Sequence, residues 1–146
     1  MTSKQKRIFY LLLFMAMIVF ILFSLPNSVA SENLAMVQMF QPDEASPLPY
    51  VFHMIAPAED LNQALRAFVF YEYYYYGFPF FGLSSVLLLP LQWIGYITNT
   101  PLVMLILRQL VSLLPMLMAL LLLIYMQDGF RTYRSVVLFA ILLFVS

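Results

Sequence analysis

Residues 8–25 read IFYLLLFMAMIVFILFSL, a run of 18 residues without a charged side chain. A helix of this length covers roughly 27 Å, close to the ~30 Å thickness of the hydrocarbon core of a bilayer. Pro26 ends the run, and Lys4, Lys6 and Arg7 precede it. Because Lys and Arg favour the cytoplasmic side, we predict a first transmembrane helix with a cytoplasmic N-terminus.

The same run has a second interpretation as a secretory signal peptide. Ser28, Val29 and Ala30 resemble a small-residue cleavage site. The apolar run is longer than the central region of most signal peptides, which favours the transmembrane helix.

The composition also favours a membrane protein. Hydrophobic residues make up 64% of the 146 positions and charged residues 10%, against about 45–50% and about 25% in a typical soluble domain. The formal net charge is zero, which argues against a nucleic-acid partner. The sequence contains no cysteine, which excludes disulfides, thiolate metal sites and cysteine nucleophiles.

A second long apolar run covers residues 101–126 and holds one charge, Arg108. Asn99 is a good helix cap. Pro101 suits the first helical position, because an N–H group there would form no hydrogen bond within the helix. Gly129 follows the run and marks its end. We predict a second transmembrane helix over this range.

Between these helices, residues 78–97 are apolar but contain two prolines and two glycines. A third crossing here would put Arg131 and Arg134 on the side opposite the N-terminal basic residues, against the preference of basic residues for the cytoplasm. We therefore expect a juxtamembrane or re-entrant helix, and we assign residues 26–98 to an outer loop.

Residues 135–146 are apolar, yet as a helix they reach only about 18 Å. They predict a truncated third transmembrane helix and a chain that is the beginning of a longer protein. The alternative is a small protein whose last helix packs inside a complex. The expected fold over residues 1–146 is all-α and integral to the membrane: a multi-pass helical bundle whose outer loop contains juxtamembrane helices.

The outer loop carries most of the negative charge. An acidic outer loop partly complements the positive-inside bias, but this does not explain two adjacent carboxylates within MFQPDEASPLPY, residues 39–50. The alternative for this pair is a solvated turn. Six of the seven acidic residues lie in the loop: Glu32, Asp43, Glu44, Glu59, Asp60 and Glu72.

Later in the loop, Glu59 and Asp60 precede Leu61, Leu65 and Phe68, which are spaced as one face of a helix. This pattern predicts a short amphipathic helix on the bilayer surface. The stretch FVFYEYYYYGFPFFG follows, and tyrosines collect at the level of the lipid headgroups. An aromatic belt is the favoured interpretation, and a platform for a sugar ring or a polyprenyl chain is the alternative.

Two single residues have open roles. His53 has no second histidine three or four positions away, so a metal site is not expected there; a packed ring competes with a ligand- or phosphate-binding role. Arg108 lies in the apolar zone, where an arginine costs on the order of 2.5–3.5 kcal/mol at the bilayer centre. It either extends to the interface, or pairs with a loop carboxylate or a substrate phosphate.

The order of these features resembles the N-terminal part of the GT-C superfamily of membrane glycosyltransferases, which includes the protein O-mannosyltransferases and the lipid A aminoarabinose transferases. Asp43 and Glu44 match the acidic pair of the first outer loop. Residues 76–79, YGFP, match the aromatic and proline start of the second juxtamembrane helix, and Arg108 matches the arginine of the next helix. Members of the superfamily have more crossings than this chain.

The resemblance implies a transferase that moves a sugar from a polyprenyl-phosphate donor to an acceptor on the outer face of the cell membrane. It implies that Asp43 is the general base of an inverting transfer and that Glu44 orients Asp43, the acceptor or a cation. A divalent cation is left open as a cofactor, and the chain alone is expected to be inactive. The substrate-binding candidates are Arg66, Arg108, His53 and Tyr76.

Two alternatives belong to other classes. The first is a small structural subunit of a membrane complex, whose methionine-rich helix 101–126 packs against other membrane subunits. The second is a transporter fragment, which is less favoured because the predicted spans hold few polar groups.

Overall fold

The computed structural model describes residues 1–73 and 77–145. Within these ranges every regular element is a helix, which confirms the all-α prediction. The chain divides into two compact units: Met1–Ser24 with Ser112–Ser146, and Leu25–Val111.

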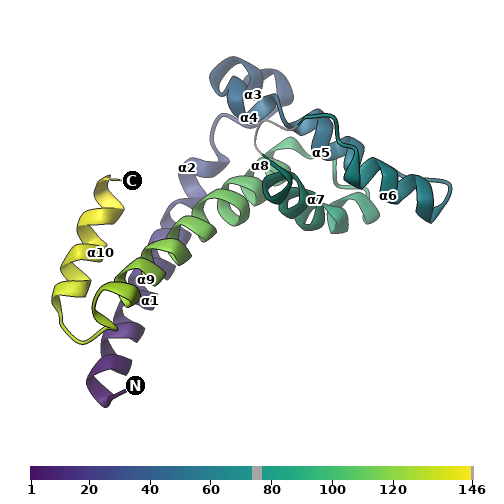
Figure 1. Ribbon diagram of the computed structural model, residues 1–146. Coiled ribbons are helices and arrows are strands. Elements are labelled where there is room, and N and C mark those ends of the chain that lie inside the picture. The colour runs from purple at the N-terminus through teal and green to yellow at the C-terminus, as the bar shows by residue number, and fades with distance from the viewer. Residues whose placement is uncertain (74–76, 146) are drawn as a thin grey trace. The chain divides into compact units, whose positions relative to one another are not determined.

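The first unit is a bundle of α1 (Ser3–Leu22), α9 (Leu114–Asp128) and α10 (Arg134–Val145), which pack against one another (Figure 1). The buried positions of α1 are spaced four residues apart, so they form one helical face. The core of this unit is made by Ile8, Leu12, Ala16, Leu113, Leu117, Leu120, Ile124, Phe130 and Phe139.

One end of this bundle joins the start of α1 to the end of α9. Thr2 and Gln5 form a capping box at the start of α1, and Gln5 Nε2 donates to the carbonyl of Gly129 at 2.9 Å. The Lys4 ammonium lies 5.7 Å from the centre of the Tyr133 ring. The basic residues in the first turns of α1 and those after α9 therefore share one end of the unit. This arrangement is needed if both groups lie on one side of a membrane.

The turn between α9 and α10 is organised by Asp128. Gly129 and Phe130 both have left-handed backbones, with φ of 61° and 60°. The Asp128 carboxylate accepts from the Phe130 N–H at 2.9 Å and from the hydroxyls of Thr132 and Ser135 at 2.7 Å each. Ser135 is buried, so its hydroxyl needs this acceptor.

Replacing Asp128 with alanine should therefore weaken the first unit. We expect Asp128→Ala to lower the free energy of unfolding by about 1–2 kcal/mol, because several donors lose one charged acceptor. Asp128→Asn, which keeps one acceptor oxygen, should cost less. Denaturant unfolding in detergent micelles, followed by circular dichroism, measures both; equal stability of wild type and Asp128→Ala would contradict this role.

Two helical stretches are long and apolar enough to cross a membrane: Ser3–Ser28, in which α2 (Ser24–Ser28) follows α1, and Thr100–Asp128. They contain the predicted spans 8–25 and 101–126. Only a minor share of each is buried within the chain, which favours association with a membrane. The apolar helix α7 (Phe78–Trp93) is shorter, at 16 residues.

The second stretch is not the regular helix that the sequence predicted. It consists of α8 (Thr100–Ile106), the π-helical segment η1 (Leu107–Leu113) and α9. Pro115 explains the change: it has no N–H group for the carbonyl of Val111, and its ring collides with that carbonyl in a regular helix. The turn before the proline widens as a result. The predicted start is confirmed, since Asn99 Oδ1 accepts from the Leu102 N–H at 3.1 Å.

The second unit is built from short helices around one core. After α3 (Leu34–Phe40) and α4 (Pro42–Ala45), α5 (Leu48–Met54) packs against both α6 (Leu61–Val69) and α7, and α7 packs against α8 (Figure 1). The buried residues of this core are Val37, Ala45, Leu48, Val51, Met54, Ile55, Tyr71, Phe81, Leu88, Leu91, Val103 and Met104.

The predicted amphipathic helix of the loop is α6. Asp60 Oδ1 caps it by accepting from the Gln63 N–H at 2.6 Å. Leu61 and Leu65 are exposed, whereas the Phe68 ring contacts Phe78 edge-on at 5.6 Å. Its location on a bilayer surface stays a prediction.

Two described tyrosines of the run pack within the second unit. Tyr71 is buried in the core, and the Tyr73 ring stacks on Tyr50 at 4.6 Å. A tyrosine ring is largely apolar, so it packs inside a unit as readily as at a headgroup layer. These two residues therefore support the fold of the second unit, and the aromatic belt stays a prediction.

Candidate functional site

Arg108 is the centre of the most polar buried cluster that the structure describes. Its side chain is 7% exposed, and its Nε and Nη2 both contact Glu44 Oε2, at 2.9 Å and 2.7 Å. Its Nη1 donates to the carbonyls of Asn27 at 2.7 Å and Val29 at 3.0 Å, and Nη2 also donates to Gln41 Oε1. Four hydrogen bonds and the ion pair with Glu44 thus engage all three nitrogens of the guanidinium.

Two chain segments bring these acceptors to Arg108. After α2 the backbone turns sharply: Ala30 has a φ of 57°, unusual for a residue other than glycine, and the buried Ser31 hydroxyl donates to the carbonyl of Ser28 at 2.9 Å. The two backbone acceptors lie at the end of α2 and at the start of this turn. The other segment is α4 with the residue before it, where Pro42 suits the first helical position.

The cluster resolves the alternatives for Arg108 in favour of the loop carboxylate. A buried arginine is tolerated only when its charge is compensated and its donors are satisfied. Glu44 supplies the charge, and the amide and carbonyl oxygens supply the remaining acceptors. A phosphate that bound Arg108 would therefore compete with these acceptors.

The other predicted site residues have different surroundings. Asp43 is exposed next to Glu44, and no described residue bonds to its carboxylate. Arg66 in α6 and His53 in α5 are exposed, and no hydrogen bond or ion pair in the described ranges links them to Arg108. Tyr76 lies outside the described residues. Among the described side chains, no group of three or more His, Asp or Glu residues is placed to hold a metal ion.

Two glutamines of this unit were not predicted as site residues. Gln41 directly precedes the acidic segment and binds Arg108. Gln109 follows Arg108, is buried, and has no partner for either amide atom among the described residues. Gln109 is next to Arg108, and Gln41 lies two residues before Asp43; this closeness to charge in an apolar chain is the signal that could have marked them.

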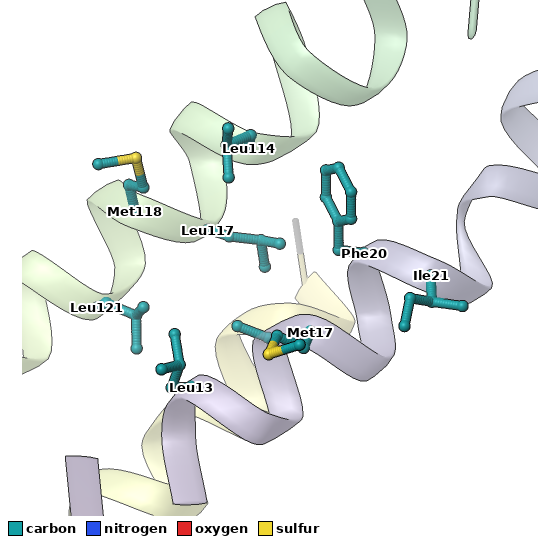
Figure 2. A pocket seen from close by; sticks show the side chains of 9 residues that line it. Leu13, Met17, Phe20, Ile21, Leu114, Leu117, Met118 and Leu121 are labelled. Carbon is teal, nitrogen blue, oxygen red and sulfur yellow. The ribbon is translucent and has the colours of Figure 1, made fainter. Parts of the chain in front are cut away.

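The first unit contains an apolar groove of about 210 Å³. Figure 2 shows side chains of α1 and α9 on its two sides, and only carbon and sulfur atoms line it. Such a groove suits a hydrocarbon chain or an apolar helix. The labelled lining residues are Leu13, Met17, Phe20, Ile21, Leu114, Leu117, Met118 and Leu121.

No family model, curated protein or solved structure matches this chain. The resemblance to the GT-C superfamily therefore rests on the short motifs at residues 43–44, 76–79 and 108.

The Arg108–Glu44 pair should show strong energetic coupling. In a double-mutant cycle of Arg108→Met and Glu44→Gln, we expect each single change to be clearly destabilising, because it leaves buried charge or donors unpaired. The double variant should recover part of the loss, with a coupling energy of about 1–3 kcal/mol.

Asp43→Asn is the matched control, since it alters an exposed carboxylate in the same turn. We expect it to change stability by less than about 0.5 kcal/mol. Unfolding in detergent micelles measures all four variants. Equal costs for Glu44→Gln and Asp43→Asn, or additive effects in the cycle, would contradict the role given to Arg108.

Proposed function

We propose that this chain takes part in glycosyl transfer at the outer face of a cell membrane, moving a sugar from a polyprenyl-phosphate donor to an acceptor hydroxyl. The observation that carries the proposal is the unequal state of the two adjacent carboxylates. Glu44 is bound to Arg108, whereas Asp43 is exposed and free to meet a substrate. The motif resemblance supports the same assignment.

In the proposed mechanism Asp43 acts as the general base. It takes the proton from the acceptor hydroxyl as that oxygen bonds to the anomeric carbon, and the bond from that carbon to the phosphate oxygen breaks. A base works best when its backbone is held in place. Arg108 supplies this support, because it binds the residues on both sides of Asp43 within one short segment, Gln41 and Glu44.

The departing phosphate needs a positive partner, and Arg66 is our first candidate. Charge developing on the phosphate is stabilised by fixed donors or cations. Arg66 is exposed, whereas Arg108 is buried and already bound to four acceptors. A divalent cation could take the same role, and His53 remains a candidate for contact with the donor.

Asp43→Asn tests this function directly. In membranes that contain the chain as it is naturally expressed, we expect transfer from a labelled polyprenyl-phosphate sugar to fall at least about 100-fold, since the general base is lost. The amount of chain in the membrane should not change. Glu32→Gln, which removes another exposed loop carboxylate, is the matched control and should retain transfer. Unchanged transfer by Asp43→Asn would remove Asp43 from the mechanism.

The proposal also requires the acidic segment to face outward. The chain has no cysteine, so a single introduced thiol reports its own side of the membrane. Ser46→Cys, in an exposed position three residues after Asp43, should react with an impermeant maleimide in intact cells. Ser3→Cys should react only after permeabilisation. Protection of position 46 in intact cells would contradict the predicted topology.

A structural subunit is the second candidate, and the groove of Figure 2 favours it. Met17 and Met118 line this groove, and methionine adapts to the shape of a packing partner. In this role the chain would migrate with a larger complex on native gels, and Asp43→Asn would leave both that migration and any transfer unchanged.

A further inference from the structure

The second unit contains a groove of its own, of about 440 Å³, within the range of about 300–1,000 Å³ of most small-ligand sites. Helices α3 and α5, with Ala56 and Pro57 shortly after α5, form an apolar wall of the groove. The end of α7, the connection to α8 and α8 itself form a wall with both polar and apolar side chains. The apolar wall is made by Leu34, Leu48, Phe52, Ala56 and Pro57.

All polar side chains of the groove come from the other wall. Gln92, Thr98 and Thr100 belong to the end of α7, the connection and the start of α8. No described residue forms a hydrogen bond with these three side chains, so their donors and acceptors are available. A groove with hydrocarbon on one segment and free hydroxyl and amide groups on another suits an amphipathic molecule.

The polar wall is held in shape by backbone hydrogen bonds. Gly95 has a φ of 76°, and the Tyr96 N–H donates to the carbonyl of Leu91 at 2.8 Å, which closes the end of α7. Asn99 then caps α8. Because these bonds fix both ends of the connection, an occupant does not have to order it on binding.

The same connection carries side chains typical of a membrane interface. Trp93 is 76% exposed and Tyr96 is 55% exposed, and Ile94 between them is also exposed. Exposed tryptophan and tyrosine side chains of membrane proteins are enriched at the level of the lipid headgroups. The wall that offers polar groups to an occupant is therefore suited to the layer in which the polar parts of lipids lie.

We propose that this groove binds one phospholipid of the surrounding bilayer, with an acyl chain against α3 and α5 and its ester and phosphate oxygens near Thr98 and Thr100. The phospholipid is the amphipathic molecule present in greatest excess around a membrane-embedded chain. An acyl chain gains little by moving from lipid into an apolar groove, because both surroundings are hydrocarbon. The free energy that holds a lipid in the groove must therefore come mainly from contacts with the polar wall.

Photolabelling of the whole chain in phosphatidylcholine vesicles tests this site. A small fraction of the lipid carries a diazirine in the middle of one acyl chain, and labelled peptides are mapped by mass spectrometry. We expect labelling of residues 48–57 and 97–103. Ala56→Phe, which fills the groove, should reduce this labelling at least about five-fold. Ala58→Phe, an exposed position of the same segment outside the groove, should not.

The double variant Thr98→Val with Thr100→Val provides a second measurement that does not depend on filling the groove. It should reduce labelling at least about two-fold while labelling of α1 and α9 stays the same. Equal labelling of wild type and this double variant would overturn the proposal, even if Ala56→Phe failed to fold. Displacement of the label by polyprenyl phosphate at lower concentrations than by phosphatidylcholine would also overturn it, because the groove would then belong to another lipid. Neither result depends on the proposed transfer activity.

Discussion

The buried charge of Arg108 is the constraint on which the second unit depends. An arginine within an apolar helix is stable there only with acceptors. Arg108 binds one carbonyl within α2 and one just after it, the amide before α4 and the carboxylate within α4. These groups are 64 to 81 residues away along the chain. One side chain thus fixes two irregular segments that have few apolar residues to hold them.

The surfaces of the two units reflect different surroundings. In the first unit, long helices leave large apolar side chains such as Phe14 and Met118 exposed, which is favourable in hydrocarbon and unfavourable in water. In the second unit the apolar side chains collect in a core, as in a water-exposed domain, while aromatic residues such as Trp93 remain outside. Exposed apolar helices in one unit and exposed aromatic residues in the other suit a chain that lies partly within a bilayer and partly at the bilayer surface.

The sequence predicted the elements that depend on local chemistry. A charge-free run marked α1, and the side chains of Asp60 and Asn99 marked the starts of α6 and α8. The partner of Arg108 could not be predicted, because the interface, a loop carboxylate and a phosphate can each satisfy a guanidinium. Only the fold shows which distant segments lie beside it. The burial of Tyr71 could not be predicted either, since the amphipathic ring suits both a core and an interface.

The π-helical segment has a consequence for insertions and deletions. Removing one residue just before Arg108, such as Leu107, would turn the guanidinium by about 100° around the helix axis relative to Val103 and Met104, which are buried in the core. The helix itself could absorb the loss by becoming regular. Loss of the Arg108 contacts would therefore cost more than the change in helix geometry. The effect of an insertion or deletion in this helix should depend on whether it lies before or after Arg108.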